Sequence, residues 1–369
     1  MGALAFNEVD SRGRAHPHAP DPARGEFARD RDRIVHSRSF RRLQHKTQVF
    51  TWDEGDHFRN RLTHTIEVTQ VARSAGRRLG LNEDLIECIA LVHDVGHPPF
   101  GHQGEVLLAD LMGAHGGFEH NRQGLRIVED LETRYPEFAG LNLTYEVRES
   151  IIKHSAHYDR AKVPDRFQPR ESPLLEAQLV DEIDSVVYDC HDIDDGLRGG
   201  YITLDGLQDV ALWRGAWAEA VDDSPRGTSQ ALLVDRAVRR LLDSLLSDLV
   251  DTTRAACTRR GIGSAAEVRA CPDQLAGVSG SLREEKERLE AWLFANLYRH
   301  HTVNRTFQRA KRILADLFTF YVEHPECMPP QARDLRERTP QRMVADYIAG
   351  MTDRYAIDEH DTLLGGWKR

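Results

Sequence analysis

Apolar residues recur at helical spacing along most of this 369-residue chain, and this pattern constrains the fold more than any other feature. The pattern predicts helices from Asn60 to Leu79, where Gly80 is a typical stop, and from an Asn82 cap to the His93-Asp94 pair. Further helices are predicted over 102–112, 119–132, 145–154, 173–194, 235–259, 281–299, 302–322 and 339–354. Because strands and helices do not alternate, the predicted fold class is all-α.

Two stretches depart from the helical pattern. Gln48 to Trp52 and His57 to Arg59 flank the turn-forming residues 53–56, which indicates a short β-hairpin insertion. Residues 1–23 are rich in Pro, Arg, His and Asp without periodicity, which predicts a flexible N-terminal segment. We therefore expect that segment, a core domain over 24–200, and a helical C-terminal extension over 201–369 packed on the core.

The composition excludes some classes of protein. A hydrophobic content of 40%, a charged content of 29% and a mean hydropathy of −0.53 are typical of a soluble globular protein. The sequence has neither a secretory signal nor an apolar run near the roughly 20 residues of a membrane span, which favours a cytoplasmic protein with no membrane partner. A net charge of −10 argues against a surface that binds nucleic acid throughout, although a local basic patch is compatible with it.

Ionisable residues are densest between His93 and Glu105, and this run predicts the floor of a metal-dependent hydrolytic site. His64 continues the apolar stripe of positions 68, 71, 75 and 79, and a lone histidine there is most often a core residue. The adjacent His93-Asp94 pair changes that interpretation, because a buried carboxylate needs a partner to offset its desolvation. A divalent cation would supply one.

A third segment carries acidic residues on one helix face. Asp184, Tyr188 and Asp192 follow one another at intervals of four, while Leu179, Ile183, Val186, Cys190 and Ile193 form the packing face. Stacked carboxylates repel one another unless a cation or substrate hydroxyls neutralise them. The alternative is a solvated acidic face, which the apolar neighbours and Tyr188 disfavour.

Taken in order, His64, His93-Asp94 and Asp184 match the H…HD…D signature of the HD-domain phosphohydrolases. The chain resembles one branch of them, the bacterial deoxyguanosine triphosphate triphosphohydrolase-like proteins and their animal relative, the dNTPase with SAM and HD domains. Five ordered blocks between about residues 29 and 200 carry the resemblance: 40–49, 59–64, 93–105, 117–121 and 188–198. The resemblance implies an HD-domain helical bundle.

The resemblance also implies a cofactor and a reaction. One divalent metal ion would be held by His64, His93, Asp94 and Asp184; Mn or Mg is expected, and Fe, Co, Ni or Zn is compatible with such ligands. Deoxynucleoside triphosphates, dGTP among them, would be hydrolysed to a deoxynucleoside and triphosphate. Relatives form tetramers or hexamers and are regulated by nucleotides or DNA, so a homo-oligomer and an allosteric dNTP or single-stranded DNA are expected partners.

Roles for further residues follow from the same resemblance. His102 matches the catalytic histidine, and Glu105, one helical turn away, would orient it or relay its proton; His97 and His120 match histidines beside the phosphates. Arg61 suits a charge clamp on the triphosphate. Tyr188 would pack under the deoxyribose, and Asp192 and Gln48 would bind its 3′-hydroxyl. Simple structural roles stay open for Gln48 in the hairpin and for His97 in the Pro98-Pro99 turn.

Two other functions compete with this prediction. One is an HD-type nucleotidase or phosphodiesterase, which the Pro98-to-His102 extension disfavours. The other is a nucleotide- or single-stranded-DNA-binding regulator with low turnover, motivated by the arginine-rich segments 29–42 and 333–342. No motif in the sequence fixes a preference among the bases.

Overall fold

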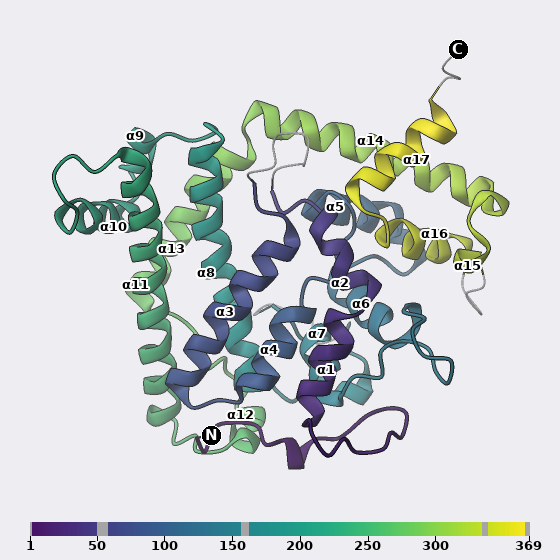
Figure 1. Ribbon diagram of the computed structural model, residues 1–369, viewed down its shortest axis with the longest axis horizontal. Coiled ribbons are helices and arrows are strands. Elements are labelled where there is room, and N and C mark those ends of the chain that lie inside the picture. The colour runs from purple at the N-terminus through teal and green to yellow at the C-terminus, as the bar shows by residue number, and fades with distance from the viewer. Residues whose placement is uncertain (1, 50–57, 156–161, 334–338, 366–369) are drawn as a thin grey trace. The chain divides into compact units, whose positions relative to one another are not determined.

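The computed structural model describes residues 2–49, 58–155, 162–333 and 339–365, and this part of the chain is predominantly helical (Figure 1). The all-α prediction is confirmed for it. The α-helices are α1 (Glu26–Val35), α2 (Arg38–Arg42), α3 (Arg61–Leu79), α4 (Glu83–Val92), α5 (Gly101–Leu111), α6 (His120–Arg126), α7 (Tyr145–Ile152), α8 (Leu175–Arg198), α9 (Leu204–Leu207), α10 (Ala211–Asp222), α11 (Gln230–Arg259), α12 (Ala265–Ala270), α13 (Gly280–Leu293), α14 (His301–Glu323), α15 (Pro330–Arg333), α16 (Pro340–Ala349) and α17 (Asp353–Leu364). No helix among the described residues is long and apolar enough to cross a membrane.

The chain divides into two compact units, and each combines three separate stretches of sequence. Unit 1 contains residues 1–11, 66–90 and 153–303, and unit 2 contains residues 12–65, 91–152 and 304–369. The domain bounds predicted from the sequence stay a prediction.

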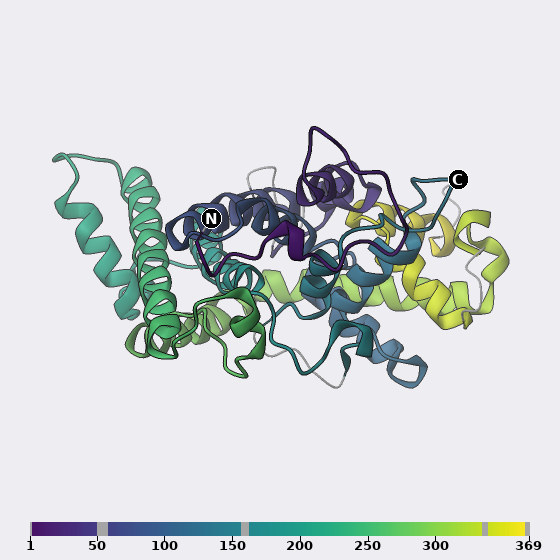
Figure 2. The same cartoon turned by 90° about the horizontal axis from the view of Figure 1, so that it is seen from below.

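Unit 1 is organised around the long helices α8 and α11. Helix α8 packs against α11 and α13, and α10 runs beside α11 (Figure 2). The predicted packing face of α8 is confirmed, because Leu179, Ile183, Val186, Cys190 and Ile193 are all buried. That burial fixes the rotation of α8 about its axis, and so fixes the face that carries the acidic residues.

Unit 2 has a core in which α5 meets the C-terminal helices. Phe100 and Leu108 from the α5 region pack in one cluster with Leu314 of α14 and with Val344 and Ile348 of α16. Gly104 lets α5 lie close to its neighbours, because a Cβ atom there would lie 2.0 Å from the carbonyl oxygen of Pro99 and 3.3 Å from Leu314. The helix that carries His102 and Glu105 is therefore held by the C-terminal part of the chain.

The boundaries of α3 and α4 agree with their predicted capping residues. Gly80 has a φ of +74°, its N–H donates to Arg77, and the N–H of Leu81 donates to the carbonyl of Gly76, which together form a Schellman stop. The Asn82 side chain accepts the N–H of Leu85 at 3.1 Å and so caps α4.

Two predicted elements need correction. The short β-hairpin is not supported: the described residues contain only isolated bridges, one of them joining Thr47 and Asn60 in antiparallel fashion, and residues 50–57 lie outside the described ranges. The single helix predicted over 339–354 is two helices, α16 and α17. The first ends at Gly350, whose carbonyl accepts a hydrogen bond from Arg42, and Thr352 caps the second.

Candidate active site

His64 lies in the first turn of α3 and is 1% exposed. The turn begins at Asn60, whose side-chain oxygen accepts the N–H of Thr63 at 3.0 Å. The predicted buried stripe is confirmed at Val68, Val71 and Ala75, whereas Leu79 is only half-buried. The histidine therefore occupies a buried position of the helix, as the periodicity indicated.

His93 and Asp94 directly follow the last residue of α4, and both are buried. The structure brings them together with His64: one ligand atom from each of the three residues lies within 4.8 Å of the other two. The two imidazole rings stand edge to face with their centroids 6.1 Å apart. Two imidazoles and a carboxylate converging in a buried place can act as ligands of one divalent ion.

The contacts of the Asp94 carboxylate hold one of its oxygens and leave the other for a metal ion. Its Oδ1 atom lies 2.9 Å from Nη1 of Arg61 and 3.0 Å from Nδ1 of His97. Its Oδ2 atom is buried without a hydrogen-bond partner among the described residues and lies 3.6 Å from Nε2 of His93. Burial alone would raise the pKa of Asp94, but Arg61, His93 and His97 hold that pKa well below its ordinary value. The group is an anion ready to bind a cation.

A second cluster joins His97, Glu105 and His120. The rings of His97 and His120 stack with centroids 4.0 Å apart, and Glu105 Oε1 accepts the backbone N–H of His120 at 2.7 Å and lies 2.8 Å from its Nδ1. These three residues could also share a cation. Burial, followed by the positive charge of Arg61, lowers the pKa of His97 to about 3, so this ring is neutral at pH 7.

His102 lies at the edge of that cluster. Its Nδ1 atom is 3.6 Å from Glu105 Oε2, and its side chain is 74% exposed. Burial raises the pKa of Glu105, but contacts with His102 and His120 outweigh burial and leave that pKa below its ordinary value. Glu105 is thus a carboxylate shared by two histidines, with the closer contact to His120 rather than to the predicted partner His102.

The loop before α5 is positioned by close contacts with the backbone of α6. A Cβ atom on Gly96 would lie 1.9 Å from the carbonyl oxygen of His120 and 2.4 Å from the nitrogen of Gly124, so only glycine lets the loop pass so close to α6. Phe100 adopts a φ of +62°, which is unusual for a residue with a side chain. This backbone turns the chain from the loop into α5.

Two buried charged side chains tie the same loop to the C-terminal part of the chain, and no sequence pattern singled them out. Lys46 Nζ donates to the carbonyl oxygens of His97 at 2.6 Å and Ala349 at 2.9 Å. Asp353 accepts the N–H of Phe100 at 2.9 Å, the N–H of Thr47 at 2.7 Å, and the Thr47 hydroxyl. Burial and then Arg42 lower the pKa of Lys46 to about 7.

Gln48 also lies in unit 2 and is buried. Its side-chain oxygen has no hydrogen-bond partner within the described part of the chain. Such an atom costs free energy unless a ligand or water satisfies it. The Arg61 Nε atom is in the same condition, while Nη1 of that residue binds Asp94.

Tyr188, Asp192 and Asp184 belong to α8 in unit 1. Asp192 is 1% exposed and accepts a hydrogen bond from the hydroxyl of Tyr298, so a fully solvated acidic face is not what the helix presents there. Burial, followed by Tyr188 and Asp192, raises the pKa of Tyr298 far above its ordinary value. Asp184 Oδ2 lies 3.9 Å from Nε2 of His154, whose ring also contacts Asp181. The role of Asp184 as a metal ligand stays a prediction.

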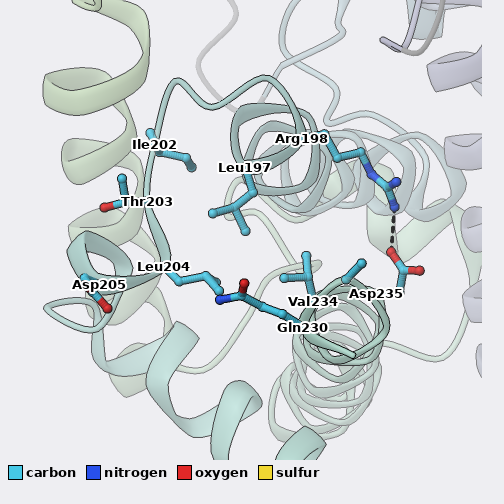
Figure 3. A pocket seen from close by; sticks show the side chains of 10 residues that line it. Leu197, Arg198, Ile202, Thr203, Leu204, Asp205, Gln230, Val234 and Asp235 are labelled. Carbon is cyan, nitrogen blue, oxygen red and sulfur yellow. Dashed lines mark hydrogen bonds and ion pairs between the residues drawn. The ribbon is translucent and has the colours of Figure 1, made fainter. Parts of the chain in front are cut away.

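Unit 1 also contains a cavity that these residues do not line. Its volume is about 430 Å³, and Leu197, Ile202, Leu204 and Val234 line it together with the Arg198–Asp235 ion pair (Figure 3). None of the predicted site residues is in its wall. Its charged side chains are that ion pair and Asp205, and no histidine among the described residues lines it, so the candidate site rests on the clusters above.

Two family models match the chain. The HD domain matches residues 61–189, and the phosphohydrolase-associated domain matches residues 276–362. The helical fold, the His64–His93–Asp94 cluster and these matches define the class of protein: a metal-dependent phosphohydrolase of the HD-domain type.

Similar proteins narrow this class. The deoxyguanosinetriphosphate triphosphohydrolase-like protein of Ralstonia nicotianae is 49% identical over 363 residues, which cover 98% of this chain and 93% of that protein. The protein of the same description from Geobacter sulfurreducens is 46% identical over 373 residues, covering 100% and 96%. The chain therefore belongs to the family of deoxyguanosinetriphosphate triphosphohydrolase-like proteins.

Proposed function

We propose that this protein hydrolyses deoxynucleoside triphosphates, dGTP among them, to a deoxynucleoside and inorganic triphosphate. The observation that carries the proposal is an unbroken row of contacts, from Asp94 to His97, from His97 to His120 and from His120 to Glu105. It joins a carboxylate suited to metal binding to Glu105, which also lies beside His102, the histidine proposed for proton transfer. The names of the similar proteins support the substrate.

A divalent ion, with Mn or Mg expected, would polarise the α-phosphoryl group and lower the pKa of bound water. His64, His93 and Asp94 would hold it, and the family resemblance adds Asp184 as a fourth ligand. Arg61 positions Asp94 through one end of its guanidinium, while its Nε atom could donate to a phosphate oxygen.

The protein's own groups would move one proton. The 5′ oxygen of the sugar leaves as an alkoxide and needs a proton, which the exposed His102 could deliver because solvent and substrate can reach it. The Glu105 carboxylate would stabilise the protonated ring of His102 while it also holds His120. The neutral His97 ring would lie beside the phosphates without adding charge.

The sugar contacts rest on the resemblance, with support from two side chains. The buried oxygen of Gln48 needs a donor such as the 3′-hydroxyl, and Asp192 is oriented by its hydrogen bond from Tyr298. Tyr188 would pack under the deoxyribose and leave no space for a 2′-hydroxyl. An analogous ribonucleotide should therefore be a poor substrate.

The test is product identity. Metal-loaded protein is incubated with each of the four dNTPs, and the products are identified by phosphorus NMR, with Asp94→Asn protein as the control for contaminating activity. Tripolyphosphate formed by the wild-type protein alone is expected. Pyrophosphate or orthophosphate in its place would instead favour a nucleotidase or phosphodiesterase.

A regulator with low turnover is the second candidate. Within the first arginine-rich segment, Arg29 and Arg33 are buried, and Arg33 donates to the carbonyl oxygens of Leu141 and Asn142. These two residues cannot belong to a surface stripe for DNA; residues 334–338 of the second segment lie outside the described ranges. Salt-dependent binding of single-stranded DNA that survives His64→Ala would favour the regulator.

The expected homo-oligomer, a tetramer or hexamer, also belongs to this proposal, as does control by an allosteric dNTP or single-stranded DNA. Both rest on the resemblance. Size-exclusion chromatography with light scattering, run with and without dGTP, measures the mass of the oligomer directly. A single mass equal to that of the monomer under both conditions would contradict the predicted oligomer.

A further inference from the structure

Unit 2 contains a cavity of about 340 Å³ whose wall is rich in arginine. We propose that this arginine cavity, lined by His115, Glu119, Arg122, Gln123, Arg126 and Arg342, binds an oxyanion of the phosphate class. None of its lining residues belongs to the candidate active site. The inference goes beyond the proposed function and does not depend on it.

The charges of the wall favour an anion. Three arginines and one glutamate line the cavity. The charge of Arg126 is compensated by the buried Asp346: Arg126 Nε lies 3.0 Å from Oδ1, and Nη2 of the same arginine donates to Oδ2. Among the described residues of the wall, Glu119 is the one carboxylate beside Arg122 and Arg342, so arginines outnumber carboxylates there. Planar guanidinium groups match the geometry of phosphate oxygens.

The backbone holds both of these arginines at the cavity. Arg342 donates to the carbonyl oxygen of Gly117, and Arg122 lies 3.4 Å from that of Gly116. Gly116 and Gly117 have φ values of +88° and +69°, a conformation that turns successive carbonyl groups toward the two side chains. The guanidinium groups are thus positioned before any ligand arrives, which lowers the entropy cost of binding.

Gln123 gives independent support. Its side chain is 1% exposed, and neither its amide nitrogen nor its oxygen has a hydrogen-bond partner among the residues described. A buried primary amide left in this condition costs free energy for each unsatisfied group. Gln123 lines the cavity, so a monoprotonated phosphate that reached its amide would satisfy both atoms: its oxygens would accept from the amide N–H, and its hydroxyl would donate to the amide oxygen.

The ligand could be inorganic phosphate or the end of a polyphosphate chain such as triphosphate, since both present the same oxygens. The cavity adjoins the catalytic cluster through α6: Glu119 directly precedes His120, and the N–H of Gln123 donates to the Glu119 carbonyl at 2.9 Å. An anion bound here would therefore contact the segment that positions His120.

The experiment is a calorimetric titration of the full chain with inorganic phosphate and, separately, with tripolyphosphate, at constant ionic strength. Arg342→Gln removes a cation of the cavity, Gln123→Met fills the amide position with an apolar group, and Arg312→Gln is the matched control, an exposed arginine of α14. Asp94→Asn disables the candidate active site instead. Circular dichroism checks that each variant is folded.

We expect at least about a tenfold loss of affinity in Arg342→Gln, equivalent to roughly 1.4 kcal/mol, with the Arg312→Gln and Asp94→Asn proteins binding like the wild type. The relative affinities for inorganic phosphate and tripolyphosphate identify which of the two ligands the cavity prefers. Binding that is lost in Asp94→Asn but kept in Arg342→Gln would overturn the proposal, because the anion would then occupy the active site. Equal losses in Arg342→Gln and Arg312→Gln would also overturn it. Tripolyphosphate production is measured separately, so the proposed function can fail without affecting this result.

Discussion

At the scale of single residues, Asp94 has the most demanding surroundings in the candidate site. One of its oxygens is held by Arg61 and His97, and the other faces His93 without a hydrogen bond among the described residues. The two oxygens therefore have different tasks: the first fixes the side chain, and the second is presented to a cation. Sequence alone identified the residue, but only the structure distinguishes its two oxygens.

Asp94→Asn should abolish both metal binding and turnover, because an amide is a weak ligand and carries no charge to balance Arg61. Loss of a residue that only hydrogen-bonds to a metal ligand lowers metal affinity by up to about 100-fold. Loss of the ligand itself should therefore lower the affinity for Mn²⁺ by at least about 100-fold. Titration calorimetry measures it. Asp110→Asn, an exposed position on α5, is the matched control and should bind metal normally. Wild-type Mn²⁺ affinity in Asp94→Asn would remove Asp94 from the ligand set.

His102→Ala should keep metal affinity but lower kcat by about 10²–10⁴-fold, the usual range for a lost general acid or base. The ring is exposed, so its loss should not disturb the fold. Steady-state kinetics of His102→Ala and His120→Ala distinguish the two histidines that share Glu105. Near-normal kcat in the first, with a large loss in the second, would assign the proton transfer to His120.

At the scale of elements, the loop of residues 95–100 before α5 depends on close contacts that no local sequence pattern reveals. Gly96→Ala should lower both stability and activity, because its Cβ atom would lie 1.9 Å from the backbone oxygen of His120 and force α6 away from the loop. Gly113→Ala is the control, since nothing lies within 4 Å of a Cβ atom there. Urea unfolding and kcat measure the two effects. If the two variants were equally stable, the close approach of Gly96 to the backbone of His120 would be contradicted.

Asp353→Asn should destabilise the protein by about 1–3 kcal/mol, because an amide cannot accept all three hydrogen bonds that this buried carboxylate accepts. The turn at Phe100 would loosen, so kcat should fall more than KM changes. Asp358→Asn, an exposed position of the same helix, serves as the comparison. Unchanged kcat in a measurably destabilised Asp353→Asn protein would show that the contact supports stability only.

The helices could be predicted from the sequence because their signals are local: an apolar period, Asn82 as a cap and Gly80 as a stop. The break at Gly350 was missed, because Thr352 begins the next helix within a few residues and the apolar period continues across the break. His64, His93 and Asp94 were singled out by the apolar stripe and the adjacent His-Asp pair, the resemblance added their shared role, and the fold brings them together. Lys46 and Asp353 could not be predicted from the sequence. Each is a buried charged residue that forms hydrogen bonds with backbone far away in the chain, and such a residue produces no periodic pattern or motif.

At the scale of the whole molecule, metal binding should be coupled to stability. A ligand that binds only the folded state stabilises it by about 2.7 kcal/mol at 100 times its Kd. Mn²⁺ should therefore raise the Tm of the chelator-treated protein, and Asp94→Asn should abolish the shift. Differential scanning calorimetry measures both. An equal rise in the Asp94→Asn protein would mean that the stabilising ions bind elsewhere.

The hydrogen bond from Phe100 to Asp353 spans 253 positions of the chain. During synthesis on the ribosome, the loop with His97 and His102 therefore emerges long before the carboxylate that fixes its turn. Every nascent chain must pass through a stage in which the candidate ligands His64, His93 and Asp94 are already synthesised but the carboxylate that fixes the adjoining loop is not. Activity would then be acquired late and abruptly in the life of each molecule, once Asp353 has left the exit tunnel.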